Sequence, residues 1–169
     1  NGCGMDEETL IRGMQYGGRG ADNPKRLGKF GLGLKTASTA FCRKLTVITR
    51  DGKESRLLKA TWDLDHVASV GEWELLLGGT SKFEKFTLEE TAQDSSGTLV
   101  IWDEIDRVLK DYDDPTGSYA RTSLKKKVDK FRHHAAMTFQ RYLDPDDKRA
   151  RHIRMNVNGK KLLPWDPFC

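Results

Sequence analysis

The chain contains the stretch Gly28-Lys29-Phe30-Gly31-Leu32-Gly33-Leu34-Lys35-Thr36-Ala37-Ser38, in which three glycines and a lysine lead into a helix-forming run. Glycine allows a positive φ and lets a ligand approach the backbone closely. A helix that begins near Gly33 would direct its unpaired N–H groups and the positive end of its dipole at the preceding loop. Lys35 adds a positive charge there. The stretch therefore predicts a phosphate-binding loop, with a simple tight turn as the alternative. Its spacing fits neither a P-loop nor the dinucleotide-binding fingerprint.

The length and composition are typical of one globular domain. The chain has 169 residues, of which 37% are hydrophobic and 32% charged, and it contains no apolar run near the ~18 residues that a membrane span requires. It begins with Asn1 and shows no leader peptide, so we expect it to begin inside a longer protein.

Its three cysteines, Cys3, Cys42 and Cys169, are odd in number and widely spaced. This pattern argues against a disulfide framework and a zinc site, and it favours a cytoplasmic location.

The net charge of +4 and the pI near 8.9 suit polyanionic ligands without requiring a nucleic acid. The basic residues gather late in the chain, in Lys125-Lys126-Lys127, Lys130, Arg132, Lys148-Arg149, Arg151 and Arg154. Two interpretations stay open for them: a solvated helix face, which is the commoner case, or a patch that contacts DNA. The neighbouring His133 and His134 would point about 100° apart on a helix, so we expect no joint metal binding by them.

The first third of the chain predicts two helices separated by a loop. Residues 6–12 begin with acidic side chains, which favours a short helix. Residues 13–27 are rich in glycine and polar residues, and a loop of this length is commonly a lid or disordered. Residues 32–41 predict a helix that packs on a sheet through Leu34, Ala37, Ala40 and Phe41.

The rest of the chain predicts strands, a long helix and a closing hairpin. Residues 45–50 and 55–62 are typical of a hairpin about Asp51-Gly52, and further strands are expected at 72–77, 82–88 and 96–102. We therefore expect a sheet of about five or more strands, mostly antiparallel. Residues 118–143 predict one amphipathic helix. Residues 153–163 predict a hairpin about Asn158-Gly159.

Taken in order, Asn1-Gly2-Cys3-Gly4-Met5, the glycine-rich loop, the Gly28 to Ser38 stretch and Gly97-Thr98 resemble the ATP-site motifs of the GHKL (Bergerat-fold) ATPases. This family unites gyrase-type topoisomerases, MutL proteins, histidine kinases, the ninety-kilodalton heat-shock chaperones and MORC proteins. Its first loop is Asp-x-Gly-x-Gly, and Gly2 and Gly4 match the two glycines. Lys35-Thr36-Ala37-Ser38 is similar to the MutL, MORC and chaperone branch, and no phosphoacceptor-helix pattern is present to favour a histidine kinase.

The resemblance implies an α+β fold: a two-layer α/β sandwich of the Bergerat type, with a mostly antiparallel mixed sheet and helices on one face. It implies a single ATP-binding domain over residues 1–169 that lacks its upstream helix, and an ATP lid over residues 13–27. The cofactors it implies are ATP and Mg²⁺. The ATP-binding residues it implies are Gly2, Gly4, Met5, Gly28, Phe30, Gly31, Leu32, Gly33, Leu34, Lys35 and Thr98.

Within that set, Gly4 and Met5 would line the adenine pocket, Thr98 would lie beneath the adenine, and Gly31, Gly33 and their neighbours would bind phosphates with Lys35 assisting. The family's adenine-binding aspartate, catalytic glutamate and magnesium-binding asparagine are expected upstream of Asn1. No catalytic residue and no metal ligand is therefore assigned within this chain, and whether it acts as an enzyme stays open.

The function implied is an ATP-binding module that couples nucleotide binding and hydrolysis to lid closure and conformational change in a larger protein. Homodimerisation on ATP binding and a DNA contact are compatible with this function, and no membrane association is expected. The main alternative is a non-catalytic module that retains the fold and binds a protein or DNA. A histidine kinase catalytic domain is the less favoured third interpretation.

Overall fold

The structure, a computed structural model, describes residues 2–17, 31–52, 56–92, 96–108 and 110–167. The chain divides into two units, Asn1–Val108 and Leu109–Cys169. The helices and strands of the first unit are α1 (Glu7–Met14), α2 (Gly33–Thr39), β1 (Lys44–Arg50), β2 (Leu58–Asp63), α3 (Leu64–Val70), β3 (Leu76–Leu77), α4 (Lys82–Ala92) and β4 (Gly97–Asp103).

The first unit is built on a four-stranded sheet with the order β3-β2-β1-β4, in which each neighbouring pair is antiparallel. The predicted antiparallel pairing is confirmed, because β1 pairs with β2 from Lys44↔Asp63 to Thr49↔Leu58. However, β2 begins at Leu58 rather than at 55, so the connection is longer than the expected tight turn about Asp51-Gly52. The predicted strand at 96–102 is also confirmed as β4, which pairs with β1 along its whole length. The fold class is therefore the predicted α+β class, although the described sheet has four strands where five or more were expected.

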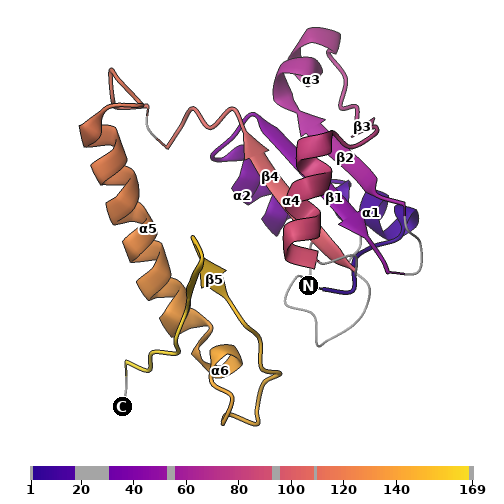
Figure 1. The fold of residues 1–169 in the computed structure, drawn as a ribbon. Coiled ribbons are helices and arrows are strands. Elements are labelled where there is room, and N and C mark those ends of the chain that lie inside the picture. Colours follow the sequence, from indigo (N-terminus) through magenta and orange to yellow (C-terminus); the bar gives the residue numbers. More distant parts are fainter. Residues whose placement is uncertain (1, 18–30, 53–55, 93–95, 109, 168–169) are drawn as a thin grey trace. The chain divides into compact units, whose positions relative to one another are not determined.

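Helices cover both faces of this sheet. Side chains of a strand alternate between its faces, so Leu45 and Val47 of β1 face α1, where they pack with Leu10 and Met14. Ile48 faces the other way and packs against the buried side chains of α4. Figure 1 shows α4 in front of the sheet, with α1 and α2 behind it. The expectation of helices on one face is wrong in this detail.

The segment after β3 is the largest error in the sequence interpretation. Residues 82–88 were expected to be a strand, but α4 begins at Lys82. Its first turn is closed by a capping box, in which the Glu84 N–H donates to Ser81 Oγ (3.2 Å) and the Ser81 N–H donates to Glu84 Oε2 (2.7 Å). Glu84 also accepts from Lys59 Nζ on β2 at 2.7 Å, which ties the helix to the sheet. Burial would raise the pKa of Glu84, but these donors outweigh it and lower the pKa.

Helix α3 was not predicted, and of the strand expected at 72–77 only Leu76–Leu77 is present as β3. Asp63 caps α3 by accepting from the N–H groups of Asp65 and His66, both at 3.1 Å. Gly71 ends the helix in the left-handed conformation with φ 76°. An N-cap aspartate and a C-terminal glycine were visible in the sequence, so the helix could have been recognised.

The second unit contains α5 (Ser118–Thr138), α6 (Gln140–Leu143), β5 (Asn156–Val157) and β6 (Lys160–Lys161). The predicted helix over 118–143 is present, but it is interrupted at Phe139. The hairpin is confirmed, because Asn158 and Gly159 both have positive φ, 50° and 73°, between the paired strands. In the part of the chain that the structure describes, no helix has both the length and the apolar character that crossing a membrane requires.

Candidate functional site

The segment that precedes α1 lies across the ends of β1 and β4. Gly4 has a φ of 67°, and a Cβ added there would lie 1.8 Å from the carbonyl oxygen of Arg50, the last residue of β1. Only glycine fits a backbone approach this close. Beside it, Ser96 Oγ donates to the Gly2 carbonyl at 2.6 Å. The predicted glycine motif is therefore held against the sheet by its backbone.

The buried hydroxyl of Thr49, on β1, contacts both the segment that precedes α1 and strand β4. Its Oγ1 accepts from the Met5 N–H at 2.9 Å, donates to the Gly97 carbonyl at 3.0 Å and lies 2.9 Å from Thr98 Oγ1. A hydroxyl carries one proton, so Thr98 is the donor when Thr49 donates to Gly97. The structure thus brings together Gly4, Met5 and Thr98, which the sequence had placed in one adenine pocket.

Sequence reasoning missed Thr49 itself. A threonine within a strand is common, because β-branched residues favour strands, and no motif marks this one. Only the pairing register reveals it, since Thr49 stands directly opposite Thr98 and Leu58 on the two neighbouring strands. Thr49 could therefore have been identified only by predicting which residues of β1 and β4 lie opposite each other.

The glycine stretch is described from Gly31 onward, whereas the predicted site residues Gly28 and Phe30 lie outside the described residues. Gly31 has a φ of 62°, which glycine adopts without strain. Helix α2 then begins at Gly33, as the sequence predicts, with Leu32 at its N-cap. Leu32 and Leu34 are each 42% exposed. The turn and the helix start are thus present in the expected order.

The side of α2 that packs on the sheet is not the predicted one. Leu34, Ala37, Ala40 and Phe41 are all exposed, whereas Lys35, Ser38 and Cys42 are buried. Each of these polar groups has a partner, as buried polar groups require: Ser38 Oγ accepts from Trp102 Nε1 at 2.8 Å, and Cys42 Sγ donates to the Ser38 carbonyl at 3.2 Å. Burial raises the pKa of the Cys42 thiol. The side of α2 that bears these polar residues can be buried because their polar groups form these hydrogen bonds.

Lys35 connects α2 to the C-terminal end of α1. Its Nζ donates to the Gly13 carbonyl at 2.7 Å and lies 5.9 Å from the ring centroid of Tyr16. The next carbonyl, that of Met14, accepts from Trp62 Nε1 at 2.8 Å. These two bonds satisfy carbonyl groups that a helix end leaves without partners, and a cation is favourable there. Burial lowers the pKa of Lys35.

Gly13 and Met14, the first two residues of the predicted lid over 13–27, belong to α1, and Met14 is buried. The lid itself stays a prediction. Residues 18–27 lie outside the described residues. Just after the helix, Tyr16 packs edge to face against Trp62 and Trp73, with ring centroids 5.6 and 5.3 Å away. These rings line a largely apolar hollow of about 640 Å³ beside the start of the predicted lid.

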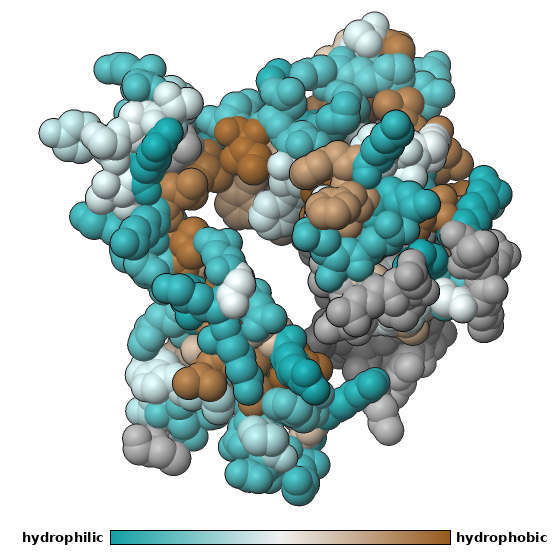
Figure 2. Space-filling view, viewed as in Figure 1, coloured by the Kyte–Doolittle hydropathy of each residue, from teal (hydrophilic) through white to brown (hydrophobic). Residues whose placement is uncertain are grey.

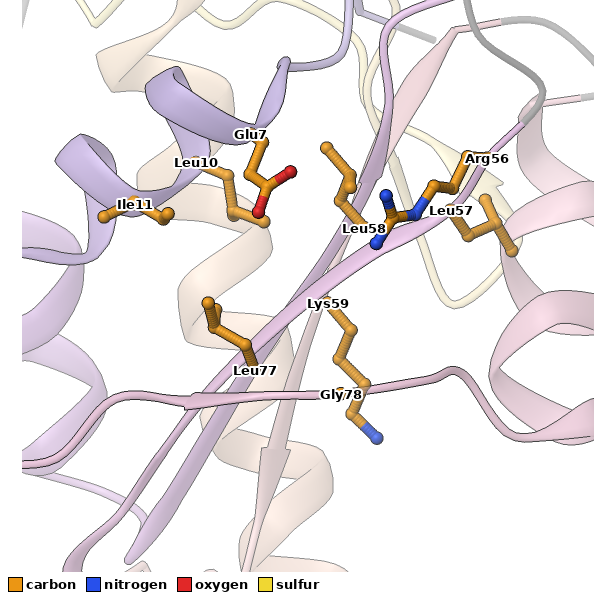
Figure 3. Close-up of a pocket in the computed structure, with 9 residues that line it drawn as sticks. All are labelled: Glu7, Leu10, Ile11, Arg56, Leu57, Leu58, Lys59, Leu77 and Gly78. Atoms are coloured by element: carbon orange, nitrogen blue, oxygen red, sulfur yellow. The ribbon is translucent and has the colours of Figure 1, made fainter.

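A smaller pocket of about 220 Å³ lies between α1 and the edge of β2. Figure 3 shows Glu7 of α1 and Arg56, which precedes β2, directed toward the same space. None of the predicted nucleotide-binding residues lines it. This pocket is therefore separate from the predicted nucleotide site.

One feature of the described residues fits a nucleotide: the positive-φ turn at Gly31 ahead of α2. The close approach at Gly4 is made to the protein's own Arg50 carbonyl, so it positions the segment that carries Met5 against β1. Within the described ranges, no group of three or more His, Cys, Asp and Glu side chains could hold a metal ion.

Residues 1–98 match the family model described as histidine kinase-, DNA gyrase B-, and HSP90-like ATPase. The chain belongs to this family. The match covers more than half of the chain and includes the first glycine motif, the Gly28 to Ser38 stretch and Thr98. The chain therefore carries an ATP-binding module of the GHKL type. A comparison with curated proteins gave no match. The assignment to the MutL, MORC and chaperone branch stays a prediction.

Proposed function

We propose that this module couples ATP binding to a conformational change at the end of α1, and that it does so within a larger protein. The observation that carries the proposal is the bond from Lys35 Nζ to the Gly13 carbonyl. Lys35 lies on the helix that follows the glycine stretch, and Gly13 lies in the last turn of α1, just before the rest of the predicted lid. One buried side chain thus joins the proposed phosphate site to the end of the helix from which the proposed moving segment continues.

The residues proposed to hold the nucleotide divide into two groups. Gly2, Gly4, Met5 and Thr98 surround the adenine, and the Thr49 hydroxyl keeps Met5 and Thr98 in place. The main-chain N–H groups from Gly28 to Leu34 hold the phosphates, because unpaired N–H groups ahead of a helix attract anions. ATP supplies the triphosphate charge that these groups bind, with Mg²⁺ as the accompanying cation.

The proposed coupling works through a difference in affinity. A ligand shifts a conformational equilibrium only when it binds one arrangement better than the other. Any displacement of α2 on binding moves Lys35, and the bond to Gly13 O would transmit that movement to the end of α1. Lid closure and ATP-promoted homodimerisation are the proposed results, since ordering a segment around a bound nucleotide is a common form of switch.

Gly33→Ala tests the phosphate site. An added Cβ at Gly33 meets no described atom within 4 Å, and alanine is favoured over glycine in a helix by up to about 1 kcal/mol. The melting temperature should therefore stay the same or rise slightly. A ligand that approaches the Gly33 backbone would meet the new methyl group, so binding of a non-hydrolysable ATP analogue, measured by calorimetry with and without Mg²⁺, should weaken at least about tenfold.

Gly79→Ala is the control, because a Cβ added at Gly79 also meets no described atom within 4 Å and this residue has no part in the proposed site. It should leave analogue affinity within about twofold. If Gly33→Ala binds the analogue as well as the unaltered chain does, the phosphates do not lie at the start of α2. If no saturable binding is found for any variant, the alternative of a non-catalytic interaction module is favoured.

A further inference from the structure

The positive charge of the chain resides in its second unit. Residues 109–169 contain 14 Lys and Arg against 8 Asp and Glu, a formal net charge of +6, whereas residues 1–108 contain 15 against 17, a net charge of −2. Such an asymmetry is the electrostatic signature of a surface that binds a polyanion. The family match over residues 1–98 does not reach this unit.

The basic side chains border a groove of about 420 Å³ between α5 and the β5–β6 hairpin. Arg121, Lys125 and Arg132 line it from the helix, and Lys160 lines it from the hairpin. The three helix positions are four and seven residues apart, so they share one face of α5. Figure 2 shows the surface over α5 to be mostly hydrophilic, with small hydrophobic patches between.

One wall of the groove is fixed by a hydrogen bond. Arg132 Nη1 donates to the carbonyl of Val157 on β5 at 3.0 Å, which joins the helix to the hairpin. Asn158, in the hairpin turn, also lines the groove. The two walls of the groove are therefore joined by a hydrogen bond from a side chain of α5 to the main chain of β5.

Apolar side chains lie among the charges. Leu124, which is 43% exposed, and the half-buried Val128 both line the groove. The carboxylate of Asp129 lies there too. Four basic side chains against one acidic side chain leave a net charge of +3 in the groove.

We propose that this groove binds a single-stranded nucleic acid without sequence preference. The phosphates contact Arg121, Lys125, Arg132 and Lys160, and the bases lie against Leu124 and Val128. Grooves that bind single strands combine a basic track for the backbone with apolar surface for the exposed faces of the bases. In a duplex the faces of the bases are stacked inside the double helix, so they could not contact Leu124 and Val128. An anionic membrane is flat and fits a convex surface better than a concave one.

The experiment measures fluorescence anisotropy of a labelled oligo(dT) strand with the whole chain over a series of salt concentrations. For single strands, the slope of log K against log salt is about −0.7 for each phosphate contact. Four contacts predict a slope of about −3. The double variant Arg121→Gln, Lys125→Gln should weaken binding roughly tenfold at about 0.1 M salt and make the slope shallower by about 1.4. Arg132 is left intact because it joins the two walls.

The matched control is Lys126→Gln, Lys130→Gln, which removes the same charge from the same helix. These two exposed lysines lie about 140° and 180° around α5 from Arg121. The control should bind oligo(dT) within about twofold of the unaltered chain. Equal losses in the two double variants would overturn the proposal, because net charge alone would then account for the binding.

Three other results would also overturn it: equal or tighter binding of duplex DNA, competition by polyglutamate at equal charge, or binding to phosphatidylserine vesicles without binding to oligo(dT). The test is independent of the proposed ATP coupling. Gly33→Ala should bind oligo(dT) as the unaltered chain does, so a failure at either site can be told from a failure at the other.

Discussion

The two units use different chemistry for the ligands proposed for them. In the first unit, the candidate nucleotide site consists of backbone in constrained positions, such as Gly4 against the Arg50 carbonyl, and of a buried hydroxyl at Thr49. In the second unit, the groove presents exposed charged side chains such as Arg121 and Lys125. Substitutions at Gly4 or Thr49 should therefore affect folding and binding together. Those in the groove should change binding in graded steps without affecting stability.

Gly4→Ala should have the largest effect. An alanine at a positive φ costs about 1–2 kcal/mol, and the Cβ would in addition lie 1.8 Å from the Arg50 carbonyl oxygen. The segment must move off the sheet, so we expect a loss of about 3 kcal/mol or more in the free energy of unfolding. Binding of the ATP analogue should be lost. Thermal denaturation and calorimetry measure the two effects.

Gly2→Ala is the control for that change. A Cβ at Gly2 meets no described atom within 4 Å, although the residue lies in the same segment. It should change stability by less than about 0.5 kcal/mol. A Gly4→Ala variant that retains both stability and analogue binding would show that the close approach is not required, and the contrast between the two units would then fail.

Thr49→Val should have the next largest effect. Valine has the same shape but leaves the Met5 N–H, the Gly97 carbonyl and the Thr98 hydroxyl without their common partner. Leaving a buried polar group unsatisfied costs about 1–3 kcal/mol. We expect a loss in that range, accompanied by at least about tenfold weaker analogue binding, measured by chemical denaturation and calorimetry.

Thr46→Val tests whether the effect on binding is specific to Thr49. Thr46 lies on the same strand with its side chain on the opposite face, where its hydroxyl pairs with Thr61 at 3.1 Å. Valine there should also reduce stability, by about 1 kcal/mol, but should leave analogue affinity unchanged. If both variants weakened binding equally, the Thr49 hydroxyl would have no specific role in the site.

The closing hairpin and the glycine motifs could be predicted from the sequence because their signals are local. Asn158-Gly159 specifies a tight turn through the positive φ that both residues adopt, whereas Asp51-Gly52 did not give the expected tight turn, because β1 and β2 pair only as far as Thr49↔Leu58. The strand expected at 82–88 is wrong, because Ser81 and Glu84 form a capping box that begins a helix there, and this Ser-x-x-Glu spacing was visible in the sequence.

The candidate site was predictable only in part. Gly4, Met5 and Thr98 were found because they belong to motifs, whereas Thr49 depends on strand register and Lys35 on how α2 is rotated about its axis. A buried lysine contradicts the hydrophobic pattern of its helix, and here its Nζ is satisfied by a hydrogen bond that it donates to the Gly13 carbonyl. Partners this distant in sequence are set by tertiary structure, which local periodicity does not report.

The smallest effect is expected in the second unit, at the pair formed by Asp147 and Arg149. The guanidinium of Arg149 donates to both carboxylate oxygens, at 2.6 to 3.1 Å, and its N–H donates to Oδ1 at 2.9 Å. The side-chain bonds first, and then the N–H, lower the pKa of Asp147 from 3.8 to about 2. A lowered carboxyl pKa favours the folded state above pH 3.8, and this contribution is lost as the pH falls through about 2.

Arg149→Gln should therefore raise the pKa of Asp147 toward 3.8, as measured by an NMR titration of the carboxyl carbon. The backbone N–H of residue 149 remains in the variant, so part of the shift in the pKa of Asp147 should persist.

Lys148→Gln is the control. It removes the neighbouring charge, whose Nζ donates to the Pro145 carbonyl at 3.1 Å, and it should move the pKa of Asp147 much less. Because this pair lies apart from the groove residues in sequence and its bonds are internal to the loop, neither variant should alter oligo(dT) or ATP-analogue binding. A change in either affinity would mean that charges in the second unit act at long range, and the graded behaviour expected of the groove could then not be assigned to Arg121 and Lys125.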